Sequence, residues 1–224
     1  MDGATRPSMN ANSIIAAWKR RLVRMAENPP YVFRDTPRHL IEQHCRRLTT
    51  FAGYSEPEVA EAEARLGVRF PAVFRTYLRE MAKSPGDLFC GSDLAGITQF
   101  EQFRAGALHL LAETDPGLSL PREAVVFLLH QGYTFTYVLA VGGFDGPTMS
   151  WIETEREPRQ VAATFTEMVN AELSQMETID RELREGGGYY LTLHPGGGAT
   201  ESHPSRATGD RPLDQGRADT GNDG

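Results

Sequence analysis

His130 has the best position for acid–base chemistry in this sequence, because it follows the apolar run Val125 to Leu129 and precedes Gly132. An imidazole titrates near neutral pH and can exchange a proton there. Catalysis also needs a nucleophile, an acid or an orienting group beside it, and no motif in the sequence supplies one. We therefore interpret His130 as a polar turn residue and predict that the chain is not an enzyme.

Glu153, Glu155 and Glu157 form a second group that could do acid–base chemistry. Such chemistry needs carboxylates in a desolvated pocket that separates their pKa values. These three alternate at the end of the segment Met149 to Glu157, which has the period of a strand. The pattern favours a charged edge strand that faces solvent or a partner.

Metal and nucleotide sites are not indicated. His39, His44 and Cys45 are five and one residues apart, whereas two zinc ligands on one helix are normally four apart. The glycine-rich stretch from Gly142 to Gly146 lacks the Lys-Ser or Lys-Thr that follows a phosphate-binding loop. We predict no metal, no cofactor and a surface loop at these glycines.

The composition excludes several classes of protein. The 224 residues carry a net charge of -7 with a pI near 5.4, which argues against a nucleic-acid partner and suits either a basic protein partner or simple solubility. Cys45 and Cys90 have neither a disulfide framework nor a metal-ligand spacing. The longest apolar run, Ala124 to Leu129, is too short to span a membrane. We expect a cytoplasmic protein.

The segment Ala124 to Val141 predicts the centre of the fold. Its two apolar halves read as paired strands joined by a tight turn at His130 to Gly132, where glycine supplies a positive φ. Gly142 to Pro147 is expected to be a loop, and Met149 to Glu157 a third strand. The fold class is α+β, with a mainly antiparallel sheet flanked by helices.

Helices are predicted on both sides of this sheet. Ser13 to Glu27 is amphipathic, and Pro37 could open a second helix with one side lined by Leu40, Ile41, His44, Cys45 and Leu48. Capping boxes at Ser55 with Glu58, at Thr98 with Glu101 and at Thr164 with Glu167 each predict a helix start. The last of these opens a long helix toward Arg184. Gly67 and Pro71 separate two further helices, and a short strand is predicted at Leu88 to Cys90.

One domain with two tails is the predicted organisation. Residues 1–12 and 186–224 are expected to be disordered, because the second of these is rich in Gly, Pro and Asp and has few apolar residues after Leu193. Residues 13–185 then form a single α+β domain, a usual size for one hydrophobic core.

Three stretches together resemble the SUKH superfamily. The stretch SEPEVAEAEARLGVRFPAVFRTYLRE from Ser55 is similar to its entry motif, His130-Gln131-Gly132-Tyr133 to its central hairpin, and WIETEREPRQVAATFTEMV from Trp151 to its ending. The resemblance covers about Ser55 to Leu173. Lys83 to Asp87 departs from the Asn-Gly-Gly-like turn of the family. The matched residues of the entry motif have capping, turn or packing roles: Ser55, Glu58, Glu63, Leu66, Gly67, Phe70, Pro71, Phe74, Tyr77 and Leu78.

The resemblance implies a non-enzymatic protein-binding domain. Most bacterial SUKH proteins look like immunity proteins, which bind and neutralise a cognate polymorphic toxin that is often a basic nuclease. Fungal members act as intracellular regulators or scaffolds, and this alternative stays open. The residues singled out for partner binding lie on the expected turns, loop and strand edge: Asp87, His130, Gln131, Tyr133, Asp145, Trp151, Glu153 and Glu155. Trp151 and Tyr133 could equally be core residues.

Overall fold

A computed structural model describes residues 10–27, 29–31, 36–185, 189–193 and 199–202. The helices are α1 (Ala11–Glu27), α2 (Arg38–Thr49), α3 (Glu56–Leu66), α4 (Ala72–Glu80), α5 (Phe100–Thr114) and α6 (Phe165–Glu185). The strands are β1 (Pro30–Tyr31), β2 (Phe51–Ala52), β3 (Ser84–Pro85), β4 (Asp93–Leu94), β5 (Ala124–His130), β6 (Thr134–Leu139), β7 (Thr148–Ile152), β8 (Arg159–Ala162), β9 (Tyr189–Leu193) and β10 (Ala199–Ser202).

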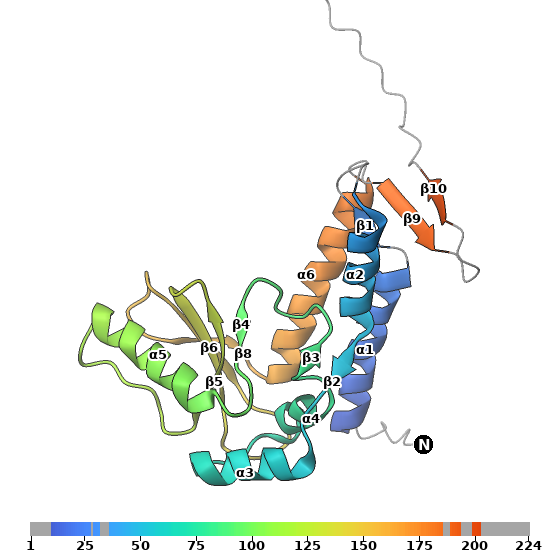
Figure 1. Ribbon diagram of the computed structural model, residues 1–224. Coiled ribbons are helices and arrows are strands. Elements are labelled where there is room, and N and C mark those ends of the chain that lie inside the picture. The colour runs from blue at the N-terminus through green and yellow to red at the C-terminus, as the bar shows by residue number, and fades with distance from the viewer. Residues whose placement is uncertain (1–9, 28, 32–35, 186–188, 194–198, 203–224) are drawn as a thin grey trace, which may run out of the picture.

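The centre of the fold is an antiparallel sheet in the order β4-β5-β6-β7-β8. Strands that follow one another in the chain's order are neighbours in this sheet; the connection from β4 to β5 contains α5, and the other three connections are loops. Helix α5 packs against β5, and α1, α2 and α6 stand together beside the sheet (Figure 1). The predicted α+β class, the central hairpin and the long C-terminal helix are confirmed.

The hairpin between β5 and β6 has the turn that its sequence predicts. Gln131 has φ of 48° and Gly132 has φ of 78°, and two successive residues with positive φ are typical of a type I′ turn. The register pairs His130 with Thr134 and Leu129 with Phe135. Every residue from Ala124 to Leu128 is buried, as expected of a strand covered on both faces.

Local capping sets the helices of the central block. The Ser55 hydroxyl accepts from the Glu58 N–H, and the Glu58 carboxylate accepts from the Ser55 N–H at 2.6 Å, so this predicted capping box is confirmed. Hydrogen bonds from the Ser55 hydroxyl and N–H, followed by one from Lys83, lower the pKa of Glu58 to about 2. Gly67 ends α3 with φ of 65°, in the left-handed region.

An aromatic cluster joins the sheet to the helices. The ring of Phe165, at the first residue of α6, lies 5.1 Å from Phe74, 5.3 Å from Tyr77, 5.6 Å from Phe127 and 5.9 Å from Trp18, measured between ring centroids. All of these side chains are buried, and burial raises the pKa of Tyr77 far above its usual range. A single core therefore extends from β5 through α4 and α6 to α1.

Helices α1 and α6 are also joined by polar contacts. The Trp18 Nε1–H donates to Asn170 Oδ1 at 3.1 Å, and Arg21 makes a bidentate ion pair with Glu177, with both N···O distances at 2.8 Å. The carboxylate of Glu177 raises the pKa of Arg21, chiefly through this hydrogen bond. The last helix therefore holds the first one by apolar and polar contacts together.

Two predictions between α4 and α5 are wrong. Leu88 to Cys90 is a turn with Phe89 at φ of 61°, and the strand lies at Asp93–Leu94 instead. Both Leu88 and Phe89 are buried, so their apolar character reflects core packing of a turn. The capping box at Thr98 does not form: the N-cap of α5 is Gln99, whose side chain accepts from the Gly96 N–H at 2.8 Å.

Further differences concern short strands and the chain ends. Ser84 and Pro85, predicted as part of a turn, pair with β2. Helix α1 begins at Ala11, inside the stretch predicted to be disordered, where the Asn10 side chain accepts from the Ser13 N–H at 2.8 Å. Strands β9 and β10 lie within the predicted disordered tail and form a small sheet with β1, which gives their backbones hydrogen-bonding partners. The other residues of both predicted tails, 1–9, 186–188, 194–198 and 203–224, lie outside the described residues.

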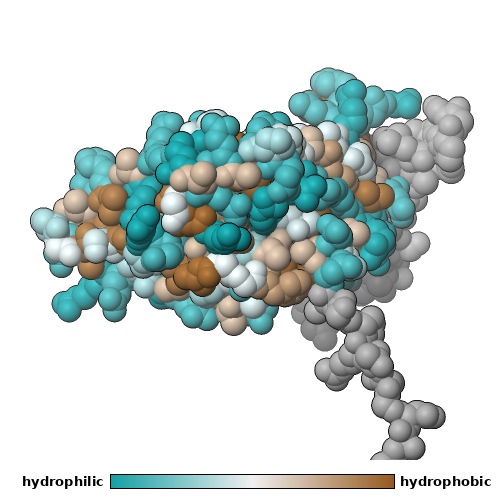
Figure 2. Space-filling view, turned by 90° about the horizontal axis from the view of Figure 1, so that it is seen from below, coloured by the Kyte–Doolittle hydropathy of each residue, from teal (hydrophilic) through white to brown (hydrophobic). Residues whose placement is uncertain are grey.

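On the face seen from below, apolar residues form small separate areas among hydrophilic ones (Figure 2). Exposed apolar residues scattered in this way are normal for a protein surface. None of the helices in the described part of the chain has the length and apolar character needed to cross a lipid bilayer.

Candidate functional site

The predicted site residues do not form one surface, and the first group lies where β5 turns into β6. The His130 Nδ1 atom lies 3.0 Å from the Ser92 hydroxyl, and its ring meets the Tyr133 ring edge-on at 5.5 Å. The Glu153 N–H donates to the Tyr133 carbonyl at 3.0 Å. We call this group, made of Ser92, His130, Gln131, Tyr133 and Glu153, the hairpin end.

The hairpin end contains a serine beside a histidine, but it lacks the further groups of a catalytic site. In the part of the chain that the structure describes, no carboxylate or thiol is bonded to the other nitrogen of His130. The groove described below is not lined by this histidine. The contact of His130 with Ser92 fixes the ring against the turn that connects α4 to β4.

Trp151, Glu155 and the strand that carries them have structural roles. The Trp151 side chain is 1% exposed, stacks on Phe135 at 5.3 Å and donates from Nε1 to the Glu155 carbonyl at 3.0 Å. The Glu155 carboxylate pairs with Arg159 of β8. The expectation of an acidic edge strand is wrong, because β7 ends at Ile152 and lies between β6 and β8. Glu153 and Glu155 belong to the turn that leads to β8.

Asp145 lies at the opposite end of the sheet, in the loop between β6 and β7. Its carboxylate accepts from the N–H of Phe165 at 3.1 Å and from the N–H of Thr166 at 3.2 Å. These are the first two residues of α6, whose N–H groups have no partner within the helix. Asp145 is therefore half-buried as a cap of α6 and is not part of the hairpin end.

Asp87 lies in a third place, beside α2. Its carboxylate is 3.0 Å from the Arg47 Nε and 3.4 Å from the His44 Nδ1. The Arg47 Nη2 atom also lies 3.3 Å from that same histidine nitrogen. Burial lowers the pKa of His44, and this effect exceeds the opposing attraction of Asp87. A neutral His44 can accept a hydrogen bond from Arg47 at this position.

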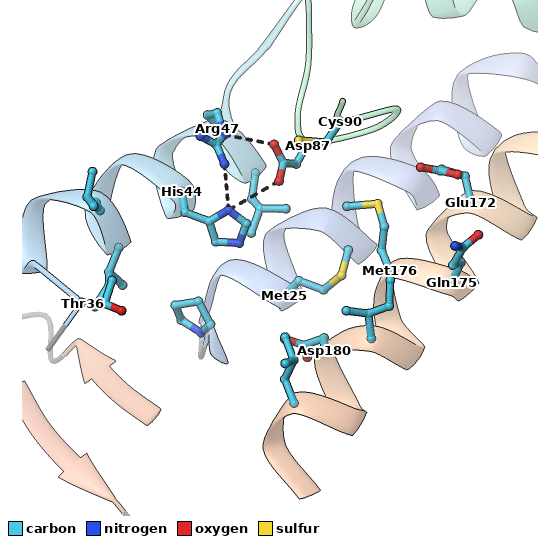
Figure 3. A pocket seen from close by; sticks show the side chains of 16 residues that line it. Met25, Thr36, His44, Arg47, Asp87, Cys90, Glu172, Gln175, Met176 and Asp180 are labelled. Atoms are coloured by element: carbon cyan, nitrogen blue, oxygen red, sulfur yellow. Dashed lines mark hydrogen bonds and ion pairs between the residues drawn. The ribbon is translucent and has the colours of Figure 1, made fainter. Parts of the chain in front are cut away.

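A groove of about 570 Å³ opens next to these three residues, between α2 and α6 (Figure 3). Its apolar lining comes mainly from three helices: Met25 of α1, Leu40, Ile41 and Leu48 of α2, and Met176, Ile179 and Leu183 of α6, with Pro29. Its polar lining consists of Thr36, His44, Arg47, Asp87, Cys90, Glu172, Gln175 and Asp180. We call this site the α2–α6 groove.

Sequence reasoning missed the groove, although it grouped Leu40, Ile41, His44 and Leu48 on one side of a helix. Ile41 and Leu48 are buried, but Leu40 is 46% exposed and His44 is half-buried. An amphipathic stripe of this kind shows that a helix face is apolar, but it does not show whether the chain covers that face completely.

The lining of the groove includes a histidine, a cysteine and three carboxylates, which are groups that can act as catalysts or metal ligands. Burial raises the pKa of the nearby Cys45 thiol, which disfavours the nucleophilic thiolate. Among the described residues, no three His, Cys, Asp or Glu side chains gather as a metal site would require. The groove has an apolar floor and charged walls, a combination that is typical of binding sites.

The fold is that of a single α+β domain in which capped helices surround an antiparallel sheet. Residues 53–171 match the model of the SMI1 / KNR4 family (SUKH-1). Because the match covers more than half of the chain, this protein belongs to that family, and the resemblance noted for Ser55 to Leu173 is confirmed. No curated protein matches the chain.

The limits of the family match divide the molecule. The match begins just before α3 and ends within α6, so α1, α2 and the part of α6 from Glu172 onward lie outside it. Of the residues that line the groove, Asp87 and Cys90 are inside the matched region. The hairpin end lies wholly inside it. The groove is thus built mainly from segments outside the matched region.

Proposed function

We propose that this protein is a non-enzymatic binding domain that neutralises a cognate bacterial toxin in the cytoplasm by direct contact. Membership of the SMI1 / KNR4 family carries the proposal, because immunity proteins are among the functions that this family implies. Neutralisation of this kind needs no chemistry from the immunity protein, since covering the toxin's active surface is sufficient.

Two features of the molecule support a protein partner. The α2–α6 groove exposes apolar side chains beside charged ones, as the surfaces that proteins use for recognition do. The net charge of -7 would attract a basic partner, such as a nuclease, over long range and would speed its association.

The proposal is tested by co-expression with a toxin encoded beside this gene. We expect the protein to restore growth to cells that produce the toxin and to co-purify with it. A destabilised control is Trp18→Ala, which we expect to leave less folded protein and therefore to weaken protection. Growth inhibition that persists, with no complex on purification, would reject the proposal.

A regulatory or scaffold module that binds a non-toxin protein is the alternative. The observation that favours it is the groove's position on segments outside the family match, because such additions often serve a partner of one particular system. A gene located among signalling or cell-wall functions, with no toxin gene nearby, would favour this alternative.

A further inference from the structure

The α2–α6 groove is a gap in a helical bundle. Helix α1 packs against both α2 and α6, and its residue Met25 lies at the bottom of the groove between them. Figure 3 shows α2 and α6 on the two sides of this space, with His44 and Met176 directed toward it. An additional helix placed there would contact all three helices, as in a four-helix bundle.

The walls of the groove expose apolar side chains that a bundle would normally bury. Leu40 on α2 is 46% exposed and Ile179 on α6 is 47% exposed. Single exposed apolar residues need no explanation, but these two line the same groove from opposite helices. Met25 and Met176 lie below them, and methionine adapts its shape to whatever packs against it.

The two walls carry charges of opposite sign. On α2, the Arg47 side chain is 50% exposed while its partner Asp87 is 12% exposed, so the guanidinium is the part that a bound molecule would meet. On α6, Glu172 makes no ion pair or side-chain hydrogen bond with other residues that the structure describes. An occupant would therefore be held best with an acidic side toward α2 and a basic side toward α6.

We infer that the α2–α6 groove binds an amphipathic α-helix of a protein partner, with its apolar stripe on Met25 and Met176. Its acidic flank lies along Arg47 and its basic flank along Glu172. Grooves between helices are a common way to recognise such helices, which are about 10–12 Å wide. The inference rests on the proposed function, since it names the surface by which the partner is held.

A helix fits these observations better than two other occupants. A small apolar molecule would use the floor but would leave Arg47 and Glu172 on opposite walls without a role. A second copy of the chain would have to place one hollow surface against another, which leaves poor contact. The sign difference between the walls also sets the direction of the bound helix, which only an extended occupant can satisfy.

The test uses the full chain and two synthetic peptides of about 18 residues, long enough to form a helix when bound. Both peptides have the same apolar stripe of leucines. One has glutamates along one flank and lysines along the other, and the second has the same residues with glutamates and lysines mixed on both flanks, so that neither direction of binding matches the two walls. We expect the first peptide to bind about tenfold more tightly in low salt, by fluorescence anisotropy.

Variants locate the binding. Ile179→Glu places a charge in the groove and should weaken the first peptide by about tenfold or more, whereas Val23→Glu, a similar change on the exposed side of α1, should leave binding unchanged. Glu172→Lys should remove the preference between the two peptides. Glu182→Lys, on the same helix but outside the groove lining, should keep it.

The outcomes separate this inference from the proposed function. Equal binding of both peptides, no binding, or equal loss with Val23→Glu overturns the inference. So does a dimer of the full chain in analytical ultracentrifugation that Ile179→Glu dissociates, because the groove then belongs to a second copy. If the toxin is neutralised by the Ile179→Glu variant as well as by the native chain, the groove is not the contact surface and the proposed function stands. If the native chain does not neutralise, the peptide result still decides the groove.

Discussion

The hairpin end and the α2–α6 groove both contain polar side chains, but these side chains differ in how far they are held by contacts within the chain. At the hairpin end, His130 contacts Ser92 and Tyr133, and the backbone of Glu153 extends the sheet. In the groove, Arg47 is half exposed and Leu40 and Ile179 face solvent. At the hairpin end the polar residues hold a turn, whereas in the groove a guanidinium and two large apolar side chains remain accessible. This difference is a reason to look for binding in the groove.

Trp18 connects α1, which lies outside the family match, to α6, where the match ends. If α1 were only an appendage to the family domain, removing this side chain would have little effect on stability. We expect Trp18→Ala to lower the free energy of unfolding by about 3–5 kcal/mol, because Trp18 is 1% exposed and packs on Phe165. Urea denaturation measures the loss. Val23→Ala on the same helix should change it by less than about 0.5 kcal/mol.

Gly53 is the first residue of the matched region and lies against the backbone of α4. A Cβ atom there would lie 2.0 Å from the Arg79 carbonyl oxygen, so one of the two backbones must move. Gly53→Ala should destabilise the protein by about 1–3 kcal/mol in thermal or urea unfolding. Gly106→Ala, within α5, is the control. A Cβ atom at Gly106 would lie 3.8 Å from its nearest neighbour, so this substitution should stabilise the protein by about 0.5–1 kcal/mol. Similar effects from both would mean that Gly53 is not a tight contact.

Asp145 tests whether a polar residue predicted to bind a partner instead has a structural role in the family domain. Asp145→Ala removes the acceptor for two N–H groups of α6 and should lower stability by about 1 kcal/mol. Asp145→Asn keeps an acceptor and should recover part of the loss. A partner contact would give another pattern, with affinity lost in both variants and the urea midpoint unchanged.

The smallest expected effect is a pH dependence in the groove. His44 faces Asp87, Arg47 and Asp180, and burial holds its pKa below the ordinary value of 6.5. A lowered pKa means that the folded state binds the proton less well than the unfolded state does. Its contribution to stability is therefore present above pH 6.5 and is lost as the pH falls through the folded pKa.

The urea midpoint should accordingly fall between pH 6.5 and about 5, before most carboxylates titrate. His44→Gln should make this decrease smaller. Stability that instead rises on acidification would show that attraction to Asp87 outweighs burial.

Local signals in the sequence predicted much of the family domain. The Ser55 capping box, the left-handed Gly67 and the turn at Gly132 each depend on a few neighbouring residues, and all three form as expected. Predictions failed where distant partners decide. Leu88 and Phe89 have the apolar pattern of a strand, but they lie in a turn whose side chains are buried in the core. Glu153 was placed on an edge strand because β8 has no apolar pattern that would reveal it.

The α2–α6 groove could not be predicted for the same reason. It depends on how α2, which ends at Thr49, and α6, which begins at Phe165, pack on α1. The sequence shows that Leu40 lies on an apolar helix face, but the part of that face left uncovered is determined by the tertiary arrangement.

The contact of Trp18 with Asn170 also has a consequence for synthesis. The two residues are 152 positions apart. At about 5–20 residues per second, roughly 8 to 30 seconds pass between their emergence from the ribosome. During that time the side of α1 that packs on α6 lacks its partner, whereas α2 and α4 have already been made and can cover other parts of the helix. The Trp18 side of the first helix must therefore stay unaggregated until nearly the whole domain has been made.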